Sequence, residues 1–90
     1  MLAGLHVIVQ GRVQGVGFRY FVLETAAGLG IKGFASNLPN GEVEVEAEGD
    51  RAVLEQFLQT IRVGPRMARV TDVLVEWKQA EHHFSGFTIR

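Results

Sequence analysis

The chain has 90 residues, of which 47% are hydrophobic and 21% charged. This composition is typical of one small globular domain and excludes a disordered or multidomain protein. Nine basic and ten acidic residues give a formal net charge of −1, which excludes a generally basic nucleic-acid-binding protein but not a local basic site. Cysteine is absent, so disulfides, thiol catalysis and cysteine-bound metal are excluded as well.

Targeting and membrane signals are also missing from the sequence. No stretch approaches the roughly 18 apolar residues of a membrane-spanning helix, and no basic segment followed by an apolar run marks a signal peptide. We therefore expect a cytoplasmic location and no membrane association. The first 41 residues carry Arg12, Arg19 and Lys32 against one acid, Glu24. An anion-binding site is thus expected in the first half of the chain.

Alternating apolar residues near the start of the chain predict a strand over residues 5–10. Three glycines among residues 11–17 then indicate a flexible loop. A helix is predicted over residues 18–29 because apolar residues recur on one face, namely Phe18, Val22, Ala26 and Leu29. Gly28 and Gly30 mark the C-terminal end of this helix.

The middle of the chain has the features of a hairpin. A short strand is predicted over residues 32–37, and the Asn40-Gly41 pair that follows is a strong hairpin signal. Residues 42–48 alternate between small apolar residues and glutamates, as in a strand with one face in solvent. That glutamate face would repel nucleic acid, and the aromatic stacking residues of RNA-binding domains are missing from the central strands.

The last part of the chain predicts a second helix and two strands. Asp50 is a good N-cap for this helix, Gly64-Pro65 ends it, and strands follow over residues 70–77 and, in shorter form, 84–90. The order of elements is that of an α+β, ferredoxin-like split βαβ sandwich. It consists of an antiparallel sheet of four or five strands with two helices on one face. Proteins with this fold have many different functions, so the function has to be inferred from the residues of a particular site.

The strongest candidate for a site is the glycine-rich loop over residues 11–17, between a strand and a helix. Its main-chain N–H groups can converge into an anion-binding nest, and the start of the helix adds further donors and a positive dipole end. Arg19, in the first helical turn, can bind the same oxygens with its guanidinium fork. The alternative is a plain connector beside a solvated arginine. The Rossmann and P-loop fingerprints fit this loop poorly.

Asn37 is the second candidate, at the end of the predicted second strand. Alone, such a residue is typical of an Asx-turn or a strand-end cap. In this fold, however, the first two strands can lie near each other. The Asn37 amide could then sit beside the anion site and hold a water molecule through both its carbonyl and its NH₂ group.

The segment from Gly11 to Arg19 resembles the first signature of the acylphosphatases at every diagnostic position. The segment Gly33-Phe34-Ala35-Ser36-Asn37, with the later residues Gly41, Val43 and Gly49, resembles their second signature. The resemblance spans nearly the whole chain and implies one acylphosphatase-like domain over residues 1–90. Two positions depart from the common pattern. Ser36 replaces a basic or amide residue and Asn40 replaces an aspartate, and neither position is catalytic in the family.

The resemblance implies an enzyme that cleaves the carboxyl–phosphate bond of small acyl phosphates. It implies that Asn37 orients the attacking water and that Arg19 binds the phosphoryl group. Main-chain N–H groups would assist the arginine, namely those of Gln14, Gly15, Val16, Gly17, Phe18 and Arg19. No metal, cofactor or covalent enzyme intermediate is expected. Inorganic phosphate or sulfate should compete with the substrate, and a monomer is expected.

The physical requirements of phosphoryl transfer agree with these roles, because the reaction needs charge stabilisation and in-line placement more than covalent chemistry. The main alternative is a non-catalytic anion-binding or regulatory module of the same fold. A related alternative is that the chain is a domain of a larger maturation protein. We do not expect this, because the sequence ends near Arg90. His82-His83 are expected to be solvated tail residues, because sequence neighbours rarely bind one metal ion.

Overall fold

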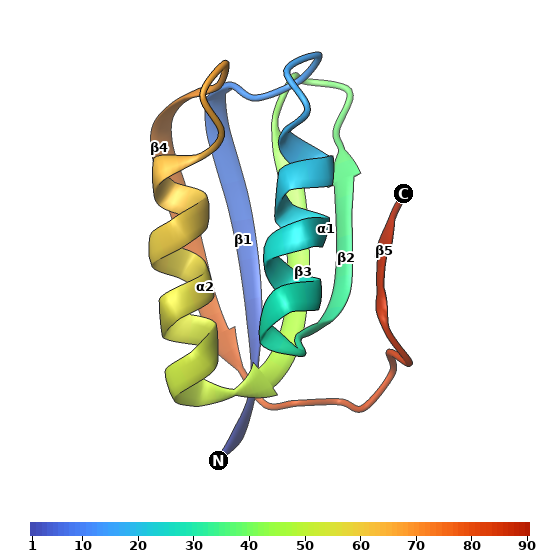
Figure 1. The fold of residues 1–90 in the computed structure, drawn as a ribbon. Helices are drawn as coiled ribbons and strands as arrows, with labels where there is room; N and C mark the ends of the chain where they lie inside the picture. Colours follow the sequence, from blue (N-terminus) through green and yellow to red (C-terminus); the bar gives the residue numbers. More distant parts are fainter.

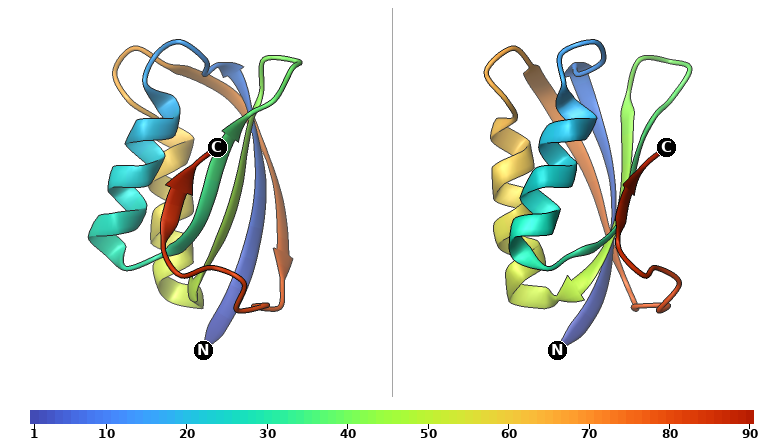
Figure 2. Two further views of the ribbon diagram at one scale, coloured as in Figure 1. Left: turned by 90° about the vertical axis from the view of Figure 1, so that its right-hand side faces the viewer. Right: turned by 45° about the vertical axis from the view of Figure 1, so that its right-hand side comes forward.

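Two helices lie side by side on one face of a five-stranded sheet in the computed structural model, which describes residues 1–90 (Figure 1). The elements, in chain order, are β1 (Leu2–Arg12), α1 (Phe18–Leu29), β2 (Lys32–Asn37), β3 (Val43–Asp50), α2 (Arg51–Val63), β4 (Arg69–Lys78) and β5 (Phe87–Ile89). Both helices lie on the same side of the sheet, as the views in Figure 2 show. The ferredoxin-like α+β fold is therefore confirmed.

The strands follow the spatial order β4-β1-β3-β2-β5. β1 pairs antiparallel with β3 and β4, and β2 pairs antiparallel with β3. β5 instead pairs parallel with β2, so the sheet is mixed rather than wholly antiparallel. The cause is the connector after β4, which crosses below the sheet before the chain turns up along β2 (Figure 1). β3 also separates β1 from β2, so the first two strands are not neighbours.

The hydrophobic core fills the space between the sheet and the helices. α1 contributes the face predicted from its spacing, namely Phe18, Val22 and Ala26, and α2 contributes Leu54, Phe57, Leu58 and Ile61. Leu29, expected on the same stripe, is only partly buried. Phe18 is 1% exposed, and burying such a side chain stabilises the fold by about 1.5–3 kcal/mol. The start of α1 is therefore firmly fixed against the sheet.

The glutamate face of β3 is less exposed than its alternation predicts. Glu46 accepts a hydrogen bond from Lys78 at 2.8 Å, and Glu48 is only 9% exposed. The Glu48 carboxylate accepts main-chain N–H groups of Glu81 and His82, in the connector between β4 and β5. The expectation of a solvated row is therefore wrong at this end of β3, because the connector covers it.

The side chains of His82 and His83 are exposed, as expected. Within the chain there is no group of three side chains that could hold a metal ion. Neither helix has the length and apolar character needed to cross a bilayer.

Replacing Glu48 with alanine should loosen the connector that leads to β5. Glu48→Ala removes the acceptor of two main-chain N–H groups, and we expect the free energy of unfolding to fall by about 1–3 kcal/mol. Urea denaturation followed by circular dichroism measures this change. Glu24→Ala on α1 is the control, because Glu24 is exposed and has no ion pair, and it should change stability by less than about 0.5 kcal/mol. Equal stability of the two variants would show that Glu48 does not anchor the connector.

Candidate active site

A cavity of about 280 Å³ lies where β1 ends, α1 begins and β2 ends. Its lining includes Val13, Gly15, Gly17, Arg19, Asn37 and Ile89. The structure therefore brings Arg19 and Asn37 together, although they are on different elements and β3 lies between β1 and β2. A second cavity of about 290 Å³, near Glu48 and His82, contains none of the predicted site residues.

The loop between β1 and α1 lines this cavity through Val13, Gly15 and Gly17, and we refer to residues 13–17 as the cradle loop. Gly15 and Gly17 have φ angles of 73° and 76°, in the left-handed region that residues other than glycine rarely adopt. A Cβ atom at either position would have no neighbour within 4 Å. The glycines therefore serve the backbone conformation and leave the space in front of the loop open.

The main-chain N–H groups of the cradle loop and the helix start have no acceptor in the protein. The main-chain N–H groups of residues 14–17 donate to no main-chain or side-chain acceptor. The first residues of α1, Phe18 and Arg19, have no intrahelical acceptor, and the N-cap, Gly17, has no side chain to supply one. Successive unpaired donors at a helix start attract an anion. In a plain connector the same donors would bind water instead.

Arg19 reaches the cavity from the first turn of α1. Its Nη1 donates to the main-chain oxygen of Arg90 at 2.8 Å, and the guanidinium forms no ion pair with an Asp or Glu side chain. The end of the chain is itself held, because the Arg90 N–H donates to Ala35 O at 2.8 Å and the Arg90 guanidinium lies over the Phe34 ring. Sequence reasoning missed this contact with Arg90, since the residues are 71 positions apart.

Asn37 ends β2, and its Oδ1 atom is buried without a hydrogen-bond partner. The Asx-turn alternative is therefore absent, because that turn requires Oδ1 to accept a main-chain N–H. Buried polar atoms are nearly always paired, so an exception requires an explanation. Asn37 lines the cavity, and an unpaired acceptor there is suited to bind an O–H donor such as water.

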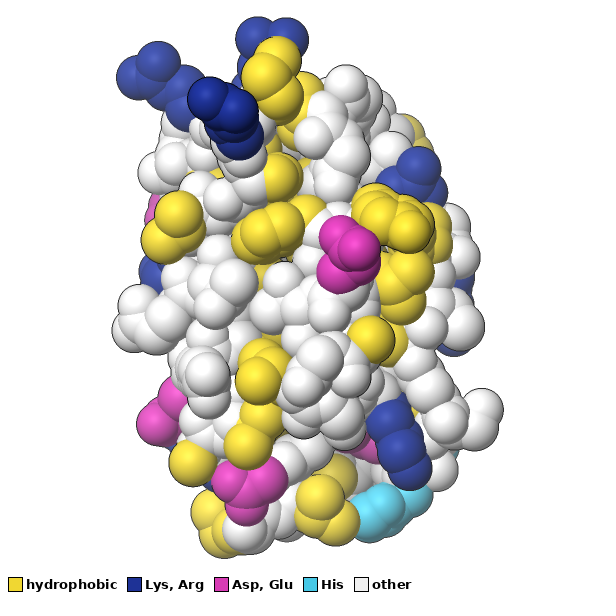
Figure 3. All heavy atoms as spheres, in the orientation of Figure 1, with side chains coloured by type: hydrophobic (Ala, Val, Ile, Leu, Met, Phe, Trp, Pro, Cys, Tyr) yellow, Lys and Arg dark blue, Asp and Glu magenta, His cyan; other side chains and the backbone are white.

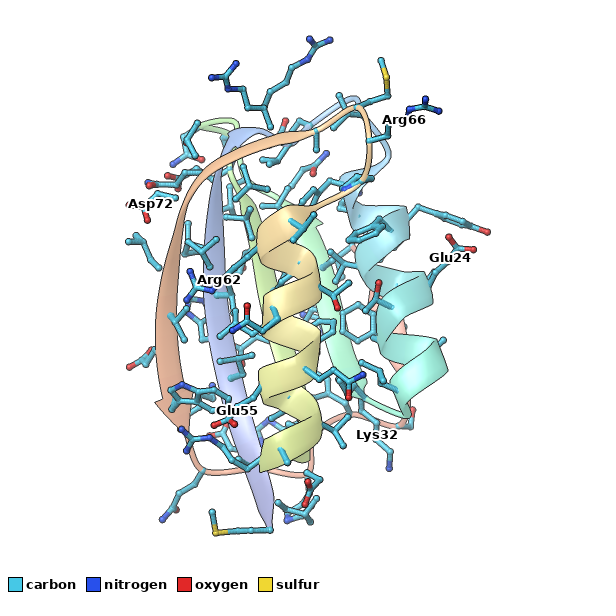
Figure 4. The ribbon with its side chains drawn as sticks, turned by 60° about the vertical axis from the view of Figure 1, so that its left-hand side comes forward. Glu24, Lys32, Glu55, Arg62, Arg66 and Asp72 are labelled. Atoms are coloured by element: carbon cyan, nitrogen blue, oxygen red, sulfur yellow. The ribbon has the colours of Figure 1, made fainter.

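Further positive charge surrounds this end of the molecule. Arg12 and Arg69 lie opposite each other across β1 and β4, and both are exposed, as is Arg66. None of the three pairs with a carboxylate within 4 Å. Basic side chains gather at this end in Figure 3, and Figure 4 places Arg66 there and Lys32 toward the other end. Such a field favours the approach of anions.

Comparison with known proteins identifies relatives over nearly the full chain. The acylphosphatase family model matches residues 5–89. An acylphosphatase of Thermus thermophilus is 49% identical over 85 residues, covering 94% of this chain and 96% of that protein. The crystal structure of acylphosphatase from Bacillus subtilis superposes with a TM-score of 0.94 at 38% identity, covering 100% of this chain and 99% of that one.

A larger protein also contains a similar fold. Full-length HypF, in its phosphate- and nucleotide-bound form, superposes with a TM-score of 0.91 at 27% identity. This chain covers only 12% of the HypF chain. The fold therefore occurs both in small acylphosphatases and as a part of a longer protein.

Removing the unpaired amide of Asn37 should not weaken the fold. A buried polar atom without a partner destabilises the folded state, so Asn37→Ala should raise the free energy of unfolding by about 1 kcal/mol. Urea denaturation of the variant and the unmodified protein measures the difference, with Ser36→Ala on the same strand as the control. A loss of stability in Asn37→Ala alone would mean that the amide is held by protein groups.

Proposed function

The chain belongs to the acylphosphatase family of enzymes, and we propose that it hydrolyses small acyl phosphates to a carboxylate and inorganic phosphate in the cavity between Arg19 and Asn37. One observation carries this proposal. A loop with unpaired N–H donors, an arginine that pairs with no Asp or Glu side chain and an unpaired amide oxygen all belong to segments that line one cavity. The first two suit a phosphoryl group, and the third suits the water that attacks it.

The phosphoryl group is bound by the main-chain N–H groups of residues 14–19 and by the Arg19 guanidinium. These donors contact the equatorial oxygens, on which negative charge is spread in the transition state. Because they are fixed before the substrate arrives, they stabilise that charge without reorganisation. The contact between Arg19 and the main chain of Arg90 keeps the guanidinium near the cradle loop.

Asn37 orients the water molecule for in-line attack on phosphorus. Its Oδ1 accepts one O–H of the water and its NH₂ group can donate to the water oxygen, which restricts the water to a near-attack position. An amide is not a base at neutral pH. The water therefore loses its proton late, to a phosphoryl oxygen of the substrate, as the bond to the acyl oxygen breaks. The departing carboxylate needs no general acid, because its pKa is about 4.

The proposed chemistry uses no metal or cofactor. The residues that line the cavity offer N–H donors, one cation and an amide, and this set contains no carboxylate, imidazole or thiol with which to bind a metal ion. We further propose that residues 1–90 form a single domain, active in the cytoplasm as a monomer, for which phosphate and sulfate are competing ligands. The arginines around the cavity favour such anions over other solutes.

A non-catalytic anion-binding module is the main alternative, because the cradle loop alone would serve it. The unpaired Oδ1 of Asn37 argues for the enzyme, since an acceptor does not help to bind a phosphate. An assay of acetyl phosphate hydrolysis in the presence of a chelator separates the two. Turnover that resists the chelator is expected, and binding of phosphate without turnover would leave only the binding module.

Arg19→Ala should remove both binding and turnover. The variant loses the only cationic group that lines the cavity, and we expect kcat/KM for acetyl phosphate to fall about 100- to 1,000-fold. Inhibition by inorganic phosphate should weaken in parallel, because the same guanidinium binds product and substrate. Steady-state kinetics measure both effects, with Arg62→Ala on α2 as the control. Near-normal kinetics of Arg19→Ala would remove this residue from the site.

Asn37→Ala should separate turnover from binding. Without an oriented water, we expect kcat to fall at least about 100-fold. The inhibition constant of inorganic phosphate should stay within about twofold, because the cradle loop and Arg19 are unchanged. Steady-state kinetics and phosphate titration by calorimetry measure the two quantities. A large loss of phosphate affinity would instead make Asn37 a ligand of the phosphoryl group.

A further inference from the structure

The side chain of Asn37 has no hydrogen bond that fixes it in the cavity. Its Oδ1 is unpaired, and the pairing of β2 with β3 ends at this residue, opposite Val43. The position of the amide therefore depends on the main chain around residue 37. The chain leaves the sheet directly after this residue, in the turn over residues 38–42, so whatever holds the turn also positions Asn37.

Gln14 holds this turn from the cradle loop. Its Nε2 donates to Leu38 O at 2.7 Å and to Glu42 O at 2.9 Å. Leu38 and Glu42 are the two ends of the turn, and the Leu38 N–H also donates to Glu42 O at 2.8 Å. One half-buried NH₂ group thus joins the loop proposed to bind phosphate to both ends of the segment that follows Asn37.

A second set of contacts makes the turn rigid. Glu42 accepts hydrogen bonds from the Gln10 side chain at 2.6 Å and from the Asn40 side chain at 2.8 Å. These bonds, with that from Gln10 first, hold the pKa of the Glu42 carboxyl below its usual range. The Glu42 N–H donates in turn to Asn40 Oδ1 at 3.1 Å. Asn40 is therefore both donor and acceptor, which an aspartate at this position could not be.

The turn also differs from the hairpin predicted by the Asn40-Gly41 pair. A two-residue type I′ turn requires positive φ at both residues, whereas only Gly41, with φ of 93°, has it here. Gly41 N–H donates to Leu38 O at 3.1 Å, within a five-residue connection. A connection of this length needs side-chain contacts to fix its position, and Gln14 supplies the link to the site.

We propose that the Gln14 side chain is a positioning residue that sets the distance between the phosphate cradle and Asn37. This inference rests on the proposed function of the site. Gln14 has two roles. Its main-chain N–H binds the phosphoryl group, and its side chain holds the turn that follows Asn37, the residue proposed to orient the water. The side chain touches neither phosphate nor water, because both of its N–H groups are donated to the turn. Its loss therefore affects turnover more than binding.

Gln14→Met tests this inference, because methionine has similar length and volume but no donors. We expect kcat for acetyl phosphate to fall about tenfold, since a small misplacement of a positioned group slows a reaction strongly. The inhibition constant of inorganic phosphate should change less than about twofold, because the main-chain N–H of residue 14 remains. Gln59→Met, at an exposed position of α2, is the control and should leave both values unchanged.

Gln14→Glu provides a second readout that does not depend on the stability of the methionine variant. An ionised carboxylate would face the oxygens of Leu38 and Glu42 and repel them, whereas the protonated acid can donate one hydrogen bond. The ratio of its kcat to that of the unmodified protein should therefore rise as the pH falls from about 6 toward 4, through the usual titration range of a glutamic acid at about 4.3. A purely structural role would not give this pH profile.

The outcomes separate this inference from the proposed function. If the unmodified protein hydrolyses acetyl phosphate and Asn37→Ala does not, the proposed function stands. An unchanged kcat in Gln14→Met, or a loss of phosphate affinity as large as the loss of kcat, would overturn the positioning role alone. A flat pH ratio in Gln14→Glu would overturn it as well. The absence of turnover in the unmodified protein would overturn both.

Discussion

The proposed site depends on a run of successive main-chain N–H groups that have no acceptor in the protein. Helices and strands pair most of their main-chain N–H groups, whereas the N–H groups from Gln14 to the first turn of α1 have no acceptor in the protein. Neighbouring side chains could have capped them, but the N-cap is Gly17 and the first turn contains no acid. The fold keeps these donors free and adds Arg19 beside them. Such an arrangement is stabilised by an anion, and a tetrahedral phosphoryl group offers enough oxygens to engage several donors at once.

The rest of the structure holds two further groups at fixed places around that anion. Burial of Phe18 fixes the start of α1, and the end of β5 holds Arg19 through the main chain of Arg90. On the other side, β2 brings Asn37 to the cavity, and the Gln14 side chain joins its turn to the cradle loop. Three segments that are distant in sequence thus meet at one end of the sheet. The reaction requires this meeting, because in-line attack depends on geometry more than on strong acids or bases.

Local patterns explain why most of the fold could be predicted from the sequence. The periodic spacing of Phe18, Val22 and Ala26 marks α1, the alternation in residues 43–47 marks β3, and Asp50 caps α2 as its residue type suggests. The glycines of the cradle loop and Arg19 also lie within one short segment. The proximity of Asn37 could be anticipated only from the topology, and the reason given was partly wrong, because β3 separates the two strands.

Contacts between residues that are distant in the chain could not be predicted, because they leave no pattern in the local sequence. The parallel pairing of β5 with β2, the bond from Arg19 to Arg90 and the burial of Glu48 under the connector all join segments far apart in the chain. The same holds for the Gln14 side chain, whose partners are 24 and 28 residues away. Sequence reasoning therefore found the groups proposed to act on the substrate but not the contacts that place them.

The central claim is that the free N–H groups of residues 14–19 bind a phosphate ion. Titration of the ¹⁵N-labelled protein with inorganic phosphate, followed by the amide signals in NMR spectra, tests it most directly. The account predicts saturable shifts that are largest for the amides of these six residues, with smaller ones at Asn37. Shifts confined to other parts of the surface, such as the arginines at positions 66 and 69, or no saturable shifts at all, would contradict it.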